Sequence, residues 1–246
     1  MADVDVNGFQ LYFETRGDGA PLLLLHGGSG IGADWTLVFG GDPAGFRTIV
    51  PDMRGHGRST NPGAFSIRAA AADIFALLDH LGLARVSAIG LSLGAKTLLH
   101  MATQQPERIE AMVLVSATPY FPAQARAAMA ALSTAAFSDA DWTLQRRRHL
   151  HGDDQIRLLF DQLRSLKDHH DDMAFTPPLL ATITARTLIV HGDRDPLYPV
   201  ELAREMYRAI PSSALWIVPN GGHGPIFGAQ AAPFVDTALA HLRAAG

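Results

Sequence analysis

A buried strand and a buried helix meet within residues 86–104, with a single residue between them. The run Val86–Leu91 is short and mostly apolar and follows a helix-ending glycine, so it suits a strand covered on both faces. From Leu93 to Gln104 the chain is apolar on nearly every side and then reaches Pro106, which predicts a buried helix. Only Ser92 remains for the corner, so the sequence predicts an abrupt strand-to-helix turn with a serine at the helix N-terminus.

Glycines flank this serine at two positions, Gly90 and Gly94. A turn this sharp strains the serine backbone, and side chains two residues before and after the serine would collide if they were not glycine. The pattern Gly-x-Ser-x-Gly therefore predicts that the Ser92 hydroxyl is exposed at the turn. A tight turn with an incidental serine fits the same five residues, so the rest of the chain decides between the two interpretations.

Strands and helices alternate along most of the chain. Asn7-Gly8 is a strong signal for a two-residue hairpin near the start. Buried strands are predicted at 21–25, 46–50, 109–115, 187–190 and 215–218, and helices at 67–81, 200–210 and 234–242. This alternation predicts an α/β fold with a mostly parallel sheet and helices on both of its faces.

The alternation breaks at Pro119. From there to Pro178 the pattern predicts helices but no strand. Ser138 and Asp141 form a capping box, and apolar residues recur at helical spacing within Ile156–Leu166. We therefore predict a helical insertion between two strands of the sheet.

The composition limits the classes of partner and chemistry. A chain of 246 residues that is 48% hydrophobic can bury a sizeable core, and its net charge of −4 offers no attraction for nucleic acid or an anionic membrane. No apolar run approaches the ~20 residues of a membrane span, and the acidic start lacks a leader pattern, so we expect a cytoplasmic protein. The absence of cysteine excludes disulfides and a thiol nucleophile. Adjacent His169 and His170 lack the spacing of helical zinc motifs, so we expect no metal. We also expect no cofactor.

Polar residues stand directly after several predicted strands. Ser92 follows one strand, Asp193 and Asp195 follow the strand that ends at residue 190, and His223 follows the strand that ends at residue 218. The glycine-rich segment 26–30 follows the strand at 21–25. Ligands of open parallel sheets bind at the carboxyl ends of the strands. The sequence therefore predicts a hydroxyl, two carboxylates and an imidazole at one edge of the sheet, in the chain order Ser, Asp, His.

Five segments in this order resemble the motifs of the α/β-hydrolase family, and the resemblance covers essentially the whole chain. The segments are His26–Gly30 (HGGSG), Asp52–Ser59 (DMRGHGRS), Gly90–Gly94 (GLSLG), His191–Pro196 (HGDRDP) and Gly221–Gly224 (GGHG). The resemblance implies a sheet of about eight strands with a helical cap inserted after the sixth strand. It also implies a core domain of residues 1–118 and 179–246, and a cap, or lid, of residues 119–178.

The resemblance also implies a catalytic triad. Ser92 is the expected nucleophile of a nucleophile elbow, and His223 is the expected base, which then acts as the acid that protonates the leaving group. A carboxylate must hold the imidazole in the right tautomer. The family places this carboxylate three residues after the glycine of a Gly-x-x-Asp turn, which selects Asp195 and leaves Asp193 as a turn residue.

Three further residues near this site have expected roles. Family position makes the backbone N–H groups of Gly28 and Leu93 the expected oxyanion hole. Lys96 follows Ser92 by one helical turn, and we interpret it as a structural charge because His223 is the better base.

Aromatic and apolar residues of the insertion and of the loops around the predicted site are expected to line the substrate pocket. These residues are Trp35, Phe121, Met129, Phe137, Trp142, Leu197 and Phe227. A mainly apolar cleft with few polar anchors suits an uncharged acyl or aryl group.

The expected function is that of a serine hydrolase, which cleaves small to medium carboxylic esters through an acyl-enzyme intermediate. Dehalogenases and epoxide hydrolases of this fold use an aspartate nucleophile, and Ser92 argues against both. Carbon–carbon bond hydrolases, lactonases and perhydrolases keep a serine and stay open, although the first usually carry asparagine in the nucleophile and oxyanion loops and this chain does not. A non-catalytic ligand-binding module is the alternative from another class. The expected partner is a small-molecule ester, and the sequence makes no prediction of oligomeric state.

Overall fold

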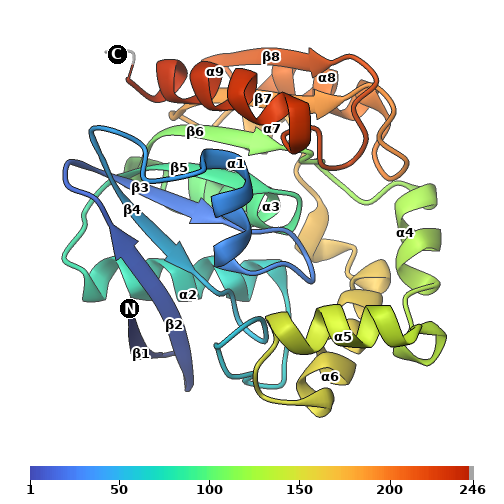
Figure 1. Ribbon diagram of the computed structural model, residues 1–246. Helices are drawn as coiled ribbons and strands as arrows, with labels where there is room; N and C mark the ends of the chain where they lie inside the picture. The colour runs from blue at the N-terminus through green and yellow to red at the C-terminus, as the bar shows by residue number, and fades with distance from the viewer. Residues whose placement is uncertain (244–246) are drawn as a thin grey trace.

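The computed structural model describes residues 1–243 and contains one eight-stranded sheet in the order β1-β2-β4-β3-β5-β6-β7-β8 (Figure 1). The pairs β1–β2 and β2–β4 are antiparallel, and every other pair is parallel. The strands are β1 Ala2–Val6, β2 Phe9–Arg16, β3 Ala20–Leu25, β4 Phe46–Pro51, β5 Val86–Leu91, β6 Ile109–Val115, β7 Arg186–Gly192 and β8 Ser213–Val218. The predicted α/β fold with a mostly parallel sheet is confirmed.

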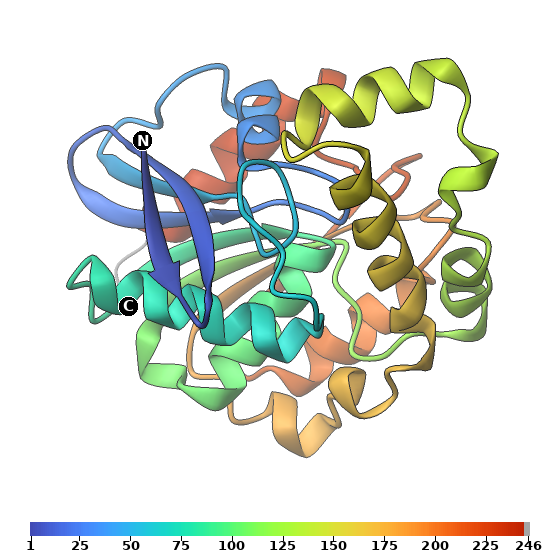
Figure 2. The same ribbon diagram turned by 90° about the horizontal axis from the view of Figure 1, so that it is seen from below.

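Helices cover both faces of this sheet (Figures 1 and 2). Residues of α2, α3 and α8 share one hydrophobic core with one face, and residues of α1 and α9 share a second core with the other face. The helices of the described chain are α1 Thr36–Phe39, α2 Ile67–His80, α3 Leu93–Gln104, α4 Ala123–Ala130, α5 Asp139–Arg148, α6 Asp153–Ser165, α7 Pro177–Leu180, α8 Val200–Ala209 and α9 Ala231–Arg243. The short helical stretch from Gly32 to Phe39 was not predicted from the sequence.

Strand β3 shows why an uninterrupted leucine run forms a central strand. Side chains of successive strand residues point to opposite faces. Leu23 and Leu25 accordingly join the core beneath α2 and α3, whereas Leu22 and Leu24 join the core beneath α1 and α9. Because both faces are covered, no polar residue is needed at alternate positions.

The helical insertion follows β6, the sixth strand, and its helices α4, α5 and α6 lie beyond the carboxyl ends of the parallel strands (Figures 1 and 2). The predicted capping box of α5 is present, because Ser138 accepts from the Asp141 amide and Asp141 accepts from the Ser138 amide. The two ends of the insertion meet at an isolated bridge between Tyr120 and Ala174. The domain boundaries 119–178 stay a prediction.

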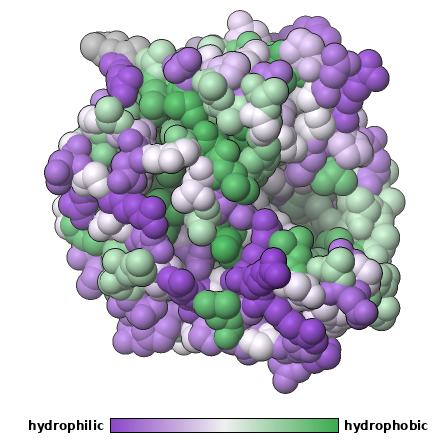
Figure 3. Space-filling view, viewed as in Figure 1, coloured by the Kyte–Doolittle hydropathy of each residue, from purple (hydrophilic) through white to green (hydrophobic). Residues whose placement is uncertain are grey.

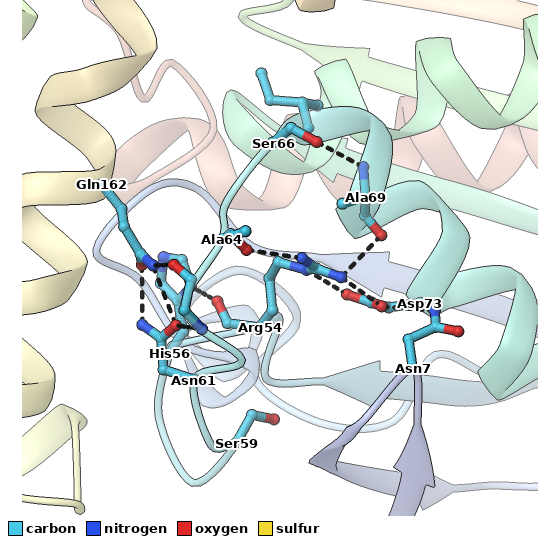
Figure 4. A network of polar contacts seen from close by, with 12 residues as sticks. Asn7, Arg54, His56, Ser59, Asn61, Ala64, Ser66, Ala69, Asp73 and Gln162 are labelled. Atoms are coloured by element: carbon cyan, nitrogen blue, oxygen red, sulfur yellow. Dashed lines mark hydrogen bonds and ion pairs between the residues drawn. The ribbon is translucent and has the colours of Figure 1, made fainter.

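A polar network ties the loop after β4 to the core and to the insertion (Figure 4). Arg54 forms two hydrogen bonds with the Asp73 carboxylate of α2, at 2.5 Å and 2.7 Å, and both side chains are buried. Asn61 and Gln162 of α6 exchange amide hydrogen bonds of 2.9 Å and 3.1 Å. Gln155 of α6 donates to three backbone carbonyls of the same loop. The insertion is therefore held to the core by hydrogen bonds as well as by apolar packing.

Candidate active site

Ser92 occupies a strained corner between β5 and α3. Its backbone has φ 50° and ψ −102°, in the left-handed region that serine rarely adopts. A Cβ atom at Gly90 would lie 2.5 Å from the carbonyl carbon of Gly94, and one at Gly94 would lie 2.2 Å from the carbonyl oxygen of Leu25. Both glycines are thus required by close backbone approach, and the Ser92 side chain stays partly exposed at the N-terminus of α3.

The imidazole of His223 lies between Ser92 and Asp195. Its Nε2 is 2.8 Å from Ser92 Oγ, and its Nδ1 is 2.8 Å from Asp195 Oδ2. A carboxylate only accepts, so Nδ1 carries the proton and Nε2 is free to accept from the serine hydroxyl. The structure therefore brings together three residues that are far apart along the chain, in an arrangement suited to removing the Ser92 proton.

Asp195 is held as a carboxylate by donors on both of its oxygens. Oδ1 accepts from the amides of Leu197 at 2.8 Å and Tyr198 at 3.2 Å, while Oδ2 accepts from His223. Burial raises the pKa of Asp195, but the hydrogen bond and charge of His223 together with these amides lower it further, so the net pKa lies below its usual value. The neighbouring Asp193 is exposed.

Two backbone amides of the loops next to Ser92 have no acceptor. Within residues 1–243, neither the Gly28 amide nor the Leu93 amide donates a hydrogen bond. The amide of Gly94 donates to the His26 carbonyl at 3.1 Å, so the loop that carries Gly28 is fixed to the first turn of α3. Free N–H groups at this position suit a developing oxyanion.

His26 and His56 hold the loops beneath the site. His26 Nε2 accepts from the Met53 amide at 2.9 Å, and its Nδ1 donates to the Gly27 carbonyl at 2.8 Å. Burial lowers the pKa of His26 to about 4, in keeping with a neutral ring that uses one nitrogen as an acceptor. His56 packs on His26 with ring centroids 4.8 Å apart. His56 Nδ1 lies 2.9 Å from the Arg54 carbonyl, so both histidines bond to the backbone of these loops.

Residues predicted to line the pocket fall into separate groups. Phe121 is buried and its ring lies next to Lys96. The ring of Phe137 packs edge-on against Trp142 and Phe160, so these aromatics form a cluster within the insertion. Figure 3 shows the surface hollowed between α4 and the core. The other members are partly buried against the two cores, namely Met129 and Leu197 against one and Phe227 against the other.

Trp35 lies on the face of the sheet covered by α1 and α9. It packs in that core near Phe39, with ring centroids 6.0 Å apart. It also lines a cavity of about 200 Å³ that includes Arg58 and Arg148. The structure therefore does not bring Trp35 into the group around Ser92.

Lys96 lies next to the Ser92 hydroxyl, a position that its interpretation as a structural charge did not predict. It is 3% exposed, and its Nζ donates to the Tyr198 hydroxyl at 2.9 Å and lies 3.5 Å from Ser92 Oγ. Burial lowers the pKa of Lys96 to about 7. Tyr198 in turn packs edge-on against the His223 ring, with centroids 5.2 Å apart. Position four residues after the serine was the available sequence signal, because it places Lys96 one helical turn away.

Comparisons with known proteins match both halves of the chain. The family model described as the alpha/beta hydrolase fold matches residues 20–172, and one described as TAP-like protein matches residues 172–243. A soluble epoxide hydrolase of Corynebacterium sp. (strain C12) is 32% identical over 115 residues, which are 46% of this chain and 40% of that protein. The match thus spans less than half the length of that relative.

Two other matches cover most of both proteins. A pimeloyl-[acyl-carrier protein] methyl ester esterase of Vibrio vulnificus (strain YJ016) is 27% identical over 237 residues, covering 87% of this chain and 91% of that protein. The structure of a meta-cleavage product hydrolase from Pseudomonas fluorescens IP01 superposes with a TM-score of 0.80 at 21% identity, covering 98% of this chain and 97% of that one. The family match over more than half of the sequence, with the observed sheet, shows that this chain belongs to the alpha/beta hydrolase fold family.

Proposed function

We propose that the protein is a serine hydrolase that cleaves small to medium carboxylic esters through an acyl-enzyme intermediate. The observation that carries this proposal is the pair of 2.8 Å contacts that His223 makes with Ser92 and Asp195. The likeness to a methyl ester esterase over 87% of the chain supports ester cleavage in particular.

In the acylation step, Nε2 of His223 takes the proton of Ser92 as Oγ attacks the ester carbonyl carbon. The carbonyl electron pair moves onto oxygen, where the amides of Gly28 and Leu93 stabilise it; one such donor is typically worth about 3 kcal/mol. The carbonyl then re-forms, the ester C–O bond breaks, and His223 gives its proton to the departing alcohol.

In the deacylation step, His223 takes a proton from water as the water oxygen attacks the acyl-enzyme. Collapse of the second tetrahedral intermediate returns the proton to Ser92 Oγ and releases the carboxylic acid. Asp195 keeps the imidazole oriented and stabilises its charged form throughout.

We also propose a cytoplasmic location and a small-molecule ester, with no nucleic acid, as the partner. The net charge of −4 supports the absence of a polyanionic partner. Among residues 1–243, no helix combines the length and the apolarity that crossing a bilayer requires.

The proposal is tested with a fluorophosphonate probe and a panel of nitrophenyl esters of graded acyl length, run beside lactones and vinylogous diketones. We expect the native protein to be labelled at Ser92 and to hydrolyse the esters, with kcat reduced about 10⁶-fold in Ser92→Ala or His223→Ala. Lack of labelling, or labelling that survives Ser92→Ala, would refute a serine nucleophile. Cleavage of the diketones in preference to the esters would replace the esterase by a carbon–carbon bond hydrolase.

A further inference from the structure

Lys96 is a cation that the fold buries beside the proposed nucleophile. Its ammonium carries three N–H donors. One donates to the Tyr198 hydroxyl at 2.9 Å, and Ser92 Oγ, at 3.5 Å, is at the limit of a hydrogen bond. The remaining surroundings are the aromatic rings of Phe121 and Tyr198, with centroids 5.4 Å and 5.0 Å from Nζ. At least one N–H of Lys96 therefore has no oxygen acceptor at normal distance within the described residues.

No carboxylate of the described chain neutralises this cation. Within residues 1–243, no Asp or Glu oxygen lies within 4.0 Å of Lys96 Nζ, which takes part in no ion pair. Asp195 is near enough to act on the Lys96 charge, but its two oxygens already accept from His223 and from two backbone amides. Buried charges are normally paired, because desolvation of an unpaired ion is costly.

The Tyr198 hydroxyl adds a second donor at the same point. It accepts from Lys96, and within the described chain no acceptor receives its own proton. A hydroxyl can accept and donate at once. The pair therefore offers two unused donors next to Ser92 Oγ, together with a positive charge that has no ion-pair partner when Lys96 is protonated. This combination matches a carboxylate.

We propose that Lys96 and Tyr198 form a subsite for a carboxylate on the acyl chain of the substrate, so that the preferred substrates are half-esters of short dicarboxylic acids. This inference rests on the proposed esterase function and specifies its substrate class. It also differs from the sequence-based expectation of an uncharged acyl group, which considered only the apolar residues around the site.

The geometry sets the length of the acyl chain. Nζ lies 3.5 Å from Ser92 Oγ, the atom to which the acyl carbon becomes bonded. A charge-assisted hydrogen bond of about 2.8 Å then places the carboxylate oxygen within about 6 Å of Oγ. With C–C bonds of about 1.5 Å, one or two methylene groups between the carbonyl and the carboxylate cover this distance. Malonyl and succinyl half-esters fit, and an adipoyl half-ester is too long to place its carboxylate there in an extended conformation.

The test compares two esters that differ in charge at one end: mono-4-nitrophenyl succinate and its methyl diester. In the wild-type protein we expect a higher kcat/KM for the monoacid, and in Lys96→Met we expect the monoacid-to-diester ratio to fall about 10- to 100-fold. Tyr198→Phe should lower the ratio to a smaller extent. Lys167→Met, which changes the chain's one other lysine at a partly exposed position, is the matched control and should keep the wild-type ratio.

A second measurement uses succinate itself to protect Ser92 against the fluorophosphonate probe. Protection is expected in the wild-type protein and in Lys167→Met, and its loss is expected in Lys96→Met. Equal cleavage of the two esters by the wild-type protein, or an unchanged ratio and unchanged protection in Lys96→Met, overturns the subsite while leaving the esterase proposal in place. Absence of both labelling at Ser92 and ester cleavage overturns the proposed function instead.

Discussion

Replacing Gly94 by alanine should destabilise the protein and misplace the proposed nucleophile. The Cβ atom of such an alanine would lie 2.2 Å from the carbonyl oxygen of Leu25 and 2.6 Å from its carbonyl carbon. Favourable non-bonded contacts lie at about 3.5–4.0 Å. The first turn of α3 therefore has to move away from β3 by about 1 Å, and the obstructing atom belongs to the backbone of a central strand, which cannot turn aside.

Two effects of opposite sign determine the magnitude for Gly94→Ala. Alanine is a better helix former than glycine by about 1 kcal/mol, which favours the variant. Overpacking typically costs about 1–3 kcal/mol, and contact with the backbone of Leu25 favours the upper end of that range. The net loss is then about 2 kcal/mol, and at roughly 2–4 °C per kcal/mol for a protein of this size the Tm should fall by about 4–8 °C.

The same displacement predicts a loss of activity. A shift of about 1 Å in a positioned group can cost about 10²-fold in rate. Thermal unfolding and the rate of ester hydrolysis are the assays, and Gly41→Ala is the control, because Gly41 is exposed and its Cβ would have no heavy atom within 4 Å. A Tm at or above the wild-type value together with kcat/KM within twofold would refute the steric argument.

Three further features of the structure are tested by substitution. Burial lowers the pKa of Lys96 to about 7, well below the ~10.4 of an unfolded lysine. Between pH 7 and about 10.4 the unfolded state therefore binds more protons than the folded state, so the free energy of unfolding should rise with pH. Urea unfolding should show this rise in the wild-type protein and a smaller one in Lys96→Met. Arg54→Met leaves the buried Asp73 carboxylate without its ion pair and should lower the free energy of unfolding by about 3–5 kcal/mol, whereas adding Asp73→Leu should recover part of the loss. Gln155→Leu removes a donor to three loop carbonyls and should lower the free energy of unfolding by about 1–3 kcal/mol and speed proteolysis of the insertion. An unchanged digestion rate would show that these hydrogen bonds do not hold the insertion to the core.

The strands and helices that could be predicted from the sequence are those whose pattern of apolar residues is long enough to be recognised. The leucine run of β3 and the apolar length of α3 each indicate burial on all sides, and Asn7 and Gly8 adopt the positive φ values that the hairpin signal implies. The stretch from Gly32 to Phe39 escaped prediction because one turn of 3₁₀-helix and one turn of α-helix contain too few residues to show a period.

The Ser92, Asp195 and His223 arrangement could be predicted because each residue lies within five residues of the end of a strand. Parallel strands end at one edge of a sheet, so strand order alone brings such residues together. Strand order does not specify the contacts between the insertion and the core. Gln155 bonds carbonyls 96 to 100 residues earlier in the chain, and no local pattern specifies which loop an amphipathic helix reaches.

Lys96 could be placed near Ser92 from the sequence, but its contacts could not be predicted. Its sequence context is unusual, because it puts a charged residue in an apolar helix. Helix α3 is apolar on nearly every side, and Lys96 is its one Lys, Arg, Asp or Glu residue. Burial of this helix on nearly every side requires burial of the Lys96 ammonium, which desolvation disfavours. A methionine at this position would have a similar length without that cost, so the lysine charge lowers stability wherever the structure supplies no counter-ion. Residues that conflict with their local environment concentrate at functional sites. A lysine buried in an apolar helix, 3.5 Å from a proposed nucleophile, is such a residue. A carboxylate on the substrate would supply its counter-ion.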